Sequence, residues 1–156
     1  MLSCQSREDL ERADGCLFLC SGNIIRSAFA ELYATHLGWN LSVRSAGTTY
    51  SNTQIHPKAR AALLQRGVSA GSIDRFRPQL LSDLTPEVRE GEWIFAMKRE
   101  HLALAKEQGA RGPVFLLTSA IGQQNEIADP YFEGGWEEVF DSIAHCVEAL
   151  VQTTAR

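Results

Sequence analysis

A thiol, a guanidinium and a hydroxyl stand close together near the beginning of the chain. Cys20 is followed by five residues, then by Arg26 and Ser27. Five residues can curl so that successive backbone N–H groups point inward and bind an anion. Gly22 and Asn23 tolerate the left-handed dihedral angles that such a curl requires. This spacing predicts an anion-binding loop with a thiol at its floor.

The chemistry of such a loop suits phosphate. Arg26 can direct two N–H donors onto phosphate oxygens. We expect Cys20 to be a thiolate at neutral pH, because inward N–H groups, a helix N-terminus and an arginine surround it, and Ser27 can donate its hydroxyl to that thiolate. A thiolate below a bound phosphate can attack phosphorus. The residues expected to bind the phosphate are Ser21, Gly22, Asn23, Ile24, Ile25, Arg26 and Ser27.

The elements around this loop predict an α/β fold. Residues 16–20 are an apolar run of strand length, and residues 28–37 are helical in composition. Further strands are expected over 41–46, 93–97 and 114–117, and further helices over 57–65, 99–108 and 137–152. Such alternation predicts a four-stranded parallel sheet flanked by helices on both faces. Ligands in these folds bind at the carboxyl ends of the strands, where the loop after Cys20 lies.

The remaining segments carry weaker signals. Residues 1–14 are expected to be a loose polar lead-in, and residues 15–152 a single domain. Residues 68–83 look irregular, and residues 86–90 are expected to form one or two helical turns.

Composition narrows the class of protein. A net charge of −4 gives no sign of the basic surface that nucleic-acid-binding proteins need. No apolar stretch reaches the ~18 residues of a membrane span, and residues 1–10 lack the apolar core of a secretory signal. We therefore expect a cytoplasmic protein that binds neither membrane nor nucleic acid and keeps its thiols free. The four histidines show no metal-ligand spacing with the cysteines, so no metal and no cofactor are expected.

The loop resembles that of the low-molecular-weight protein tyrosine phosphatase family. Residues 20–27 match every fixed position of the family's Cys-x-Gly-Asn-x-x-Arg-Ser motif. Ala30-Glu31 and the Ser-Ala-Gly-Thr run at 45–48 are also similar to the family. Its second signature, Asp-Pro-Tyr, is matched at residues 129–131, about a hundred residues downstream. The resemblance covers roughly residues 15–151 and implies the family's four-stranded parallel fold.

The resemblance also implies roles for individual residues. Cys20 would be the nucleophile that forms a phosphocysteine, and Arg26 would bind the phosphate and stabilise the transition state. Asp129 would protonate the leaving phenol and then activate water. Ser27 would stabilise the thiolate, and Asn23 would hold the shape of the loop.

The implied substrate is a phosphotyrosine protein or a small aryl phosphate, with phosphate and other oxyanions as inhibitors. Tyr50, Tyr131 and Phe132 lie in loops expected to flank the site, where they could sandwich a phosphotyrosine ring. The expected assembly is a monomer or a weak dimer.

Three departures from the family stand out. Ile25 occupies a position where many members have a second cysteine, which traps the oxidised nucleophile as a disulfide. Lys98 replaces a common aspartate, and residues 73–79 lack the histidine often found there, which puts the outer support of the loop in question.

Two other functions fit parts of the pattern. One is a phosphate- or phosphoprotein-binding homologue with weak activity. The other is arsenate reductase, whose chemistry needs two further cysteines, whereas none lies between Cys20 and Cys146.

Overall fold

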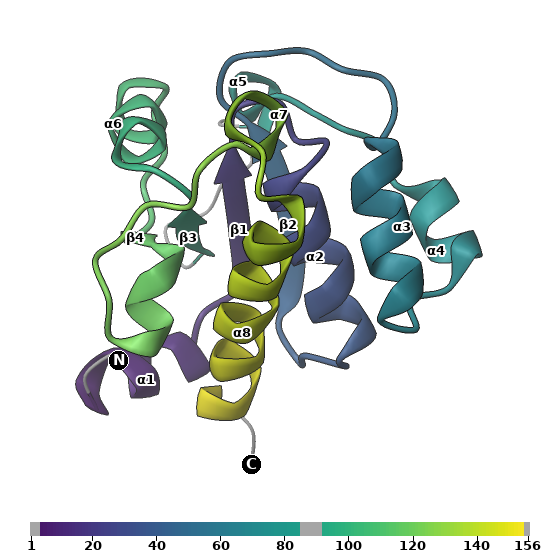
Figure 1. Ribbon diagram of the computed structural model, residues 1–156. Coiled ribbons are helices and arrows are strands. Elements are labelled where there is room, and N and C mark those ends of the chain that lie inside the picture. The colour runs from purple at the N-terminus through teal and green to yellow at the C-terminus, as the bar shows by residue number, and fades with distance from the viewer. Residues whose placement is uncertain (1–3, 85–91, 155–156) are drawn as a thin grey trace.

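A parallel sheet forms the centre of the computed structural model, which describes residues 4–84 and 92–154 (Figure 1). The strands are β1 (Gly15–Cys20), β2 (Ser42–Gly47), β3 (Glu92–Ala96) and β4 (Val114–Leu116). They lie in the order β2-β1-β3-β4, with all neighbours parallel. The predicted four-stranded parallel sheet is therefore confirmed. The helical turns expected over 86–90 fall outside the described residues.

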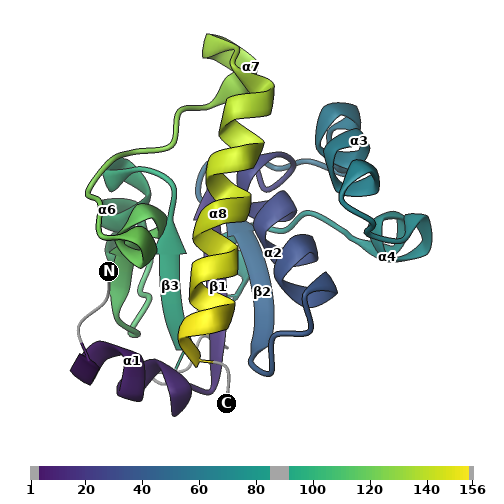
Figure 2. The ribbon, with the colours of Figure 1, turned by 60° about the horizontal axis from the view of Figure 1, so that its bottom comes forward.

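Helices cover both faces of the sheet because β1 is apolar on both sides. Leu17 and Leu19 pack on one face with α5 (Leu81–Leu84) and α6 (Arg99–Glu107). Cys16 and Phe18 alternate with them and face the larger layer of α2 (Arg26–His36), α3 (Pro57–Gln65) and α8 (Trp136–Thr154). Figure 2 shows α8 lying along the sheet over β1. Successive side chains of β1 thus point to opposite faces while all six residues are buried, as a central strand of a sheet covered on both faces requires.

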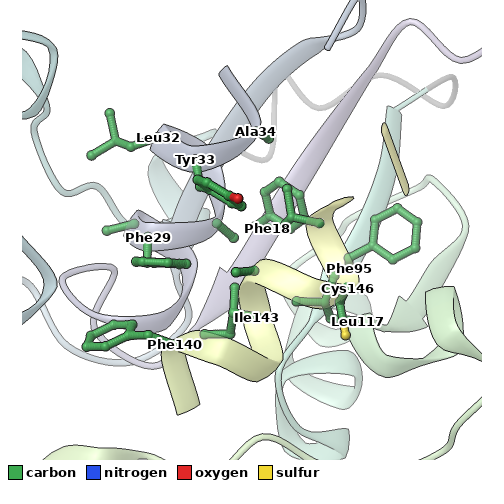
Figure 3. Close-up of a cluster of buried hydrophobic side chains, with 14 of the residues drawn as sticks. Phe18, Phe29, Leu32, Tyr33, Ala34, Phe95, Leu117, Phe140, Ile143 and Cys146 are labelled. Atoms are coloured by element: carbon green, nitrogen blue, oxygen red, sulfur yellow. The ribbon is translucent and has the colours of Figure 1, made fainter. Parts of the chain in front are cut away.

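The main core lies between α2, α8 and the sheet. Phe29 of α2 stacks on Tyr33 and packs against Phe140 of α8, with ring centroids 5.7 and 4.8 Å apart. Figure 3 shows these rings meeting Ile143 and Phe18 between the two helices and the sheet. The predicted amphipathic C-terminal helix is confirmed. Cys146 on its inner face is fully buried, and this burial raises the pKa of its thiol to about 11.

The N-terminal segment is not a loose lead-in. Residues Cys4–Glu11 form helix α1, which packs against α8 and buries Leu10 completely. The expectation was wrong because eight mostly polar residues carry no helical periodicity of their own. Their helix depends on tertiary packing, as short helices generally do.

Residues 68–83 are also more ordered than expected. They contain α4 (Ala70–Arg75) and α5, each anchored by a buried residue, Ile73 and Leu81 respectively. Ser69 caps α4 by accepting a hydrogen bond from the Ser72 N–H at 3.1 Å. Helices of four to six residues span too few turns for a periodic pattern to show in sequence.

The carboxyl ends of the strands lie on the side of the sheet where the segments expected to carry the site are found. The arrowhead of β1 in Figure 1 points toward α7 (Pro130–Glu133) and toward the segment of residues 48–56 that joins β2 to α3. Within the described residues, no helix is long and apolar enough to cross a membrane.

Candidate active site

The loop after β1 is shaped by hydrogen bonds to its carbonyl groups. The segment of residues 48–56 supplies the donors. These bonds run from Thr48 N to Cys20 O (2.9 Å), from Thr49 N and Tyr50 N to Ser21 O (3.0 Å each), from Asn52 Nδ2 to Gly22 O (3.0 Å) and from His56 N to Ile24 O (2.9 Å). In a trans peptide the N–H group points away from the preceding carbonyl, so the N–H groups that follow these carbonyls point away from their donors and are free for an anion.

Asn23 gives the loop its left-handed turn, and Gly22 leaves room beside it. Asn23 has a φ of 57°, in the left-handed region, as its small polar side chain permits. A Cβ atom at Gly22 would stand 2.8 Å from Nδ2 of Asn52. Only glycine therefore allows Asn52 to reach the carbonyl of residue 22.

The buried side chain of Asn23 orients the hydroxyl nearest the thiol. Its Nδ2 donates to Oγ of Ser27 and to Oγ of Ser45, both at 2.8 Å. Since Ser27 accepts from Asn23, its own proton is available to Sγ of Cys20, 2.9 Å away. The structure thus places the hydroxyl of Ser27 within hydrogen-bond distance of the Cys20 sulfur, as the sequence predicted.

The missing histidine of residues 73–79 is replaced by other contacts. The backbone N–H of Gln79 donates to Oδ1 of Asn23 at 3.0 Å. Ser45, which accepts from Asn23, donates in turn to Oε1 of Glu31 at 2.7 Å. Burial raises the pKa of Glu31, and the hydrogen bond from Ser45 opposes that rise. The outer support of the loop is therefore present, built from different residues.

Arg26 joins the loop to the segment that carries Asp129. Its side chain is only 2% exposed, and Nη1 donates to the carbonyl of Ile127 at 2.8 Å. Ile127 is held in turn by its N–H bond to Met97 O at the end of β3. Nη2 of Arg26 lies 3.5 Å from Oδ2 of Asp129. The guanidinium is thus fixed between the phosphate loop and the candidate acid.

Asp129 is both the cap of a short helix and a wall of the pocket. Its Oδ1 accepts from the N–H of Tyr131 at 3.0 Å and caps α7, which begins at Pro130. Its side chain is 20% exposed. One carboxylate oxygen is thereby fixed, and the other faces Arg26.

These groups meet in one pocket of about 500 Å³. Its lining contains Cys20, Arg26 and Asp129 together with the three expected aromatic residues. Tyr50, Tyr131 and Phe132 are 58%, 62% and 73% exposed, so they form the rim of the pocket. Of the predicted phosphate-binding residues, Ser21, Gly22, Ile24 and Ile25 also line it. The fully buried Asn23 and Ser27 lie behind the loop and support it.

His101 is a support of the loop that the sequence analysis missed. Its Nδ1 accepts from the N–H of Lys98 at 3.0 Å, so the proton is on Nε2, which donates to Oγ of Ser21 at 3.0 Å. Burial, and then the positive charges of Arg26 and Lys98, lower the pKa of His101 to about 3. The imidazole is therefore neutral. The sequence offered one signal for this role: a histidine in the first turn of a helix that follows a strand.

Lys98, which replaces a common aspartate, does not line the pocket. Its Nζ lies 3.9 Å from Oε2 of Glu133 in α7. Among the described residues, no group of three or more His, Cys, Asp or Glu side chains is placed to hold a metal ion.

Comparison with known proteins agrees with this geometry. The family model described as "Low molecular weight phosphotyrosine protein phosphatase" matches residues 15–156. A protein-arginine-phosphatase of Bacillus subtilis (strain 168) is 29% identical over 90% of this chain and 93% of its own length. A putative low molecular weight protein-tyrosine-phosphatase of Klebsiella pneumoniae is 32% identical over 85% of this chain and 88% of its own.

A solved structure gives the same assignment. The Erwinia amylovora tyrosine phosphatase AmsI superposes with a TM-score of 0.77 and 25% identity, covering 92% of this chain and 95% of its own. The match of the family model to nearly the whole chain, together with the loop and the pocket described above, leads to one assignment: this chain belongs to the low molecular weight phosphotyrosine protein phosphatase family.

Proposed function

We propose that this protein hydrolyses phosphotyrosine and related aryl phosphates through a phosphocysteine intermediate. The observation that supports this most strongly is the convergence of Cys20, Arg26 and Asp129 on one aromatic-rimmed pocket.

The first chemical step transfers the phosphoryl group to sulfur. The thiolate of Cys20 attacks phosphorus, the bond from phosphorus to the phenolic oxygen breaks, and Asp129 gives its proton to that oxygen. The inward N–H groups of the loop and the guanidinium of Arg26 stabilise the charge on the three other phosphate oxygens. The products are free phenol and phosphocysteine.

The second step releases phosphate. Asp129, now a carboxylate, removes a proton from water as the water oxygen attacks phosphorus, and the bond between phosphorus and sulfur breaks. The thiolate and the acid are restored together with inorganic phosphate. Because phosphate is the product held by the loop, phosphate and similar oxyanions should compete with substrate.

The rim favours an aromatic leaving group. Three exposed rings surround the pocket, and aromatic faces pack well against a flat phenyl ring. Phosphoarginine is the second candidate, because the Bacillus subtilis relative bears the name protein-arginine-phosphatase.

The free state of the described Cys16, Cys20 and Cys146 supports action in a reducing compartment such as the cytoplasm.

The test is phosphocysteine formation over a series of aryl phosphates, with phosphoarginine as a separate substrate. Cys20→Ser should lose turnover yet still bind phosphate, since the loop N–H groups and Arg26 remain. Asp129→Asn should slow phenyl phosphate far more than nitrophenyl phosphate, because a phenol of pKa near 10 needs the proton that a nitrophenol does not. The acid's contribution is typically ~10²–10⁴-fold.

Glu126→Gln is the matched control. Glu126 lies in the same segment, but its carboxylate accepts from the backbone N–H of Arg99 at 2.8 Å and does not line the pocket. Glu126→Gln should leave unchanged the way in which the rate of phosphocysteine formation depends on the leaving group. Equal slowing of all aryl phosphates by Asp129→Asn would contradict the acid role, and preferred turnover of phosphoarginine would contradict the aryl specificity.

A further inference from the structure

A second cavity, of about 420 Å³, lies beside the catalytic pocket. We call it the α3–α4 groove, and define it by Thr53, Ile55, Arg60, Asp74, Phe76 and Arg77. It adjoins the pocket along one stretch of chain, because Tyr50, Ser51 and Asn52 line the pocket and Thr53, Gln54 and Ile55 line the groove. Figure 1 shows this stretch arching from the sheet to α3, with α4 packed beside α3.

The groove lies in the most basic part of the described chain. Residues 53–77 carry five basic side chains and one acidic one, although the whole chain has a net charge of −4. Two of the basic residues, Arg60 and Arg77, line the groove itself, while Ile55, Ile73 and Phe76 give it an apolar floor. Such a surface is complementary to acidic side chains with an aliphatic stem.

Arg77 is held ready for a ligand. Its Nη1 donates to the carbonyls of Asp74 and Phe76 at 2.7 and 2.8 Å. Its guanidinium is thereby fixed at the groove, so little side-chain freedom is lost when a carboxylate binds.

Arg60 has a partner that a ligand can replace. Its Nε lies 3.3 Å from Oδ1 of Asp74, and the two side chains are 40% and 63% exposed. Exposed ion pairs are weak. A carboxylate from a bound peptide can therefore replace Asp74 as the partner of Arg60. The negative charge of Asp74 also reduces the positive charge of the groove that attracts such a carboxylate.

We propose that the α3–α4 groove binds acidic residues flanking the phosphotyrosine of a peptide or protein substrate. The proposal rests on the phosphotyrosine phosphatase function proposed above. With the phosphotyrosine in the catalytic pocket, the peptide crosses the segment of Asn52 and Thr53, and an acidic side chain enters the groove between Arg60 and Arg77.

The test compares phosphotyrosine peptides that differ only in their flanks. Glu residues are placed on the N-terminal or the C-terminal side, and the matched peptides carry Gln. One of the two Glu peptides should have a kcat/KM about 2- to 5-fold above its Gln counterpart for each arginine engaged. Raising the salt concentration should shrink this ratio, because exposed charges are screened.

Variants separate the groove from general electrostatics. Arg60→Gln and Arg77→Gln should lower the Glu-to-Gln ratio, and Asp74→Asn should raise it. Arg75→Gln is the matched control, since it removes the same charge from α4 outside the groove lining. It should leave the ratio unchanged. All four variants should keep wild-type turnover of nitrophenyl phosphate, which is too small to reach the groove.

The possible failures are distinct. A Glu-to-Gln ratio of one in the wild type, with both peptides hydrolysed, would overturn the groove and leave the phosphatase function standing. An equal loss in Arg75→Gln and Arg60→Gln would likewise overturn it. Failure to hydrolyse any phosphotyrosine peptide would overturn both proposals.

Discussion

At the scale of single residues, the site separates one thiol that lines the pocket from two that lie in the core. Cys20 lines the pocket, whereas Cys16 and Cys146 are fully buried in the core. Burial, and then the charge of Glu92, raise the pKa of Cys16 well above its usual value. Neither core thiol is a ready partner for an oxidised Cys20, and the loop position next to Arg26 is Ile25.

This arrangement predicts irreversible oxidation. Peroxide should carry Cys20 through sulfenic acid to sulfinic and sulfonic acids, so a reductant should restore little activity. Ile25→Cys should supply the missing partner and make the inactivation reversible, with Ile25→Ala as the control that only removes the side chain. The measurement is activity after peroxide and then reductant, with mass spectrometry of Cys20. Full recovery of the wild type would contradict the prediction.

The buried neutral histidine gives a second prediction, on stability. The folded-state pKa of His101 is about 3, whereas an unfolded histidine titrates near 6.5. Between these values the unfolded chain binds the proton and the folded chain does not, so the free energy of unfolding falls as pH drops below about 6.5. At pH 5 the loss is about 2 kcal/mol relative to pH 7 or above.

Urea unfolding at pH 7 and pH 5 checks this effect. His101→Gln keeps an N–H donor in the place of Nε2 but does not titrate. It should lose less stability than the wild type over the same interval. Equal losses in the two proteins would show that His101 is not the group responsible.

At the scale of elements, the segment of residues 48–56 and helix α2 shape the phosphate loop from its two ends. The segment binds the loop's carbonyls, and α2 begins at Arg26, directly after the curl. Under the proposed function, the positive end of α2 and the N–H groups of the loop would therefore act on the same bound phosphate. Helix α6 contributes through His101, and α7 through its capping residue Asp129, which pairs with Arg26. Four separate elements thus fix a loop of a few residues.

Helix α1 takes no part in the site and allows stability to be tested separately from activity. Leu10→Ala should lower the free energy of unfolding by about 2–5 kcal/mol, because it leaves a cavity in a fully buried position against α8. Catalysis should be unchanged, since Leu10 does not line the pocket. The exposed Glu8 on the same helix offers a control, Glu8→Ala, which should have little effect. Denaturant unfolding that shows no difference between the two would mean that α1 does not pack as described.

At the scale of the whole molecule, the parallel sheet brings distant segments to one edge. Residues 20–27, 48–56 and 129–132 are separated by up to about a hundred positions in sequence, yet all contribute to one pocket at the carboxyl ends of the strands. The same topology places the basic α3–α4 groove next to that pocket. A substrate that reached both would be selected by charge as well as by its phosphorylated ring.

The sequence alone determined the features that depend on local pattern. The spacing of Cys20 and Arg26, the four strands and the long amphipathic α8 follow from residue types and periodicity, and the strands and α8 were predicted with bounds close to those observed. The phosphate loop belongs to this group because an asparagine suits its left-handed position at residue 23 and a glycine leaves room for Asn52 at residue 22.

Only the tertiary structure decided which residues support that loop. The contacts of His101 with Ser21 and of Gln79 with Asn23 join residues 80 and 56 positions apart, and no local pattern encodes such a pairing. Helices α1, α4 and α5 are too short to show a period, and buried contacts at Leu10, Ile73 and Leu81 anchor them. The physical reason is the same in each case: local propensity is weak, and the free energy that fixes these groups comes from packing against distant parts of the chain.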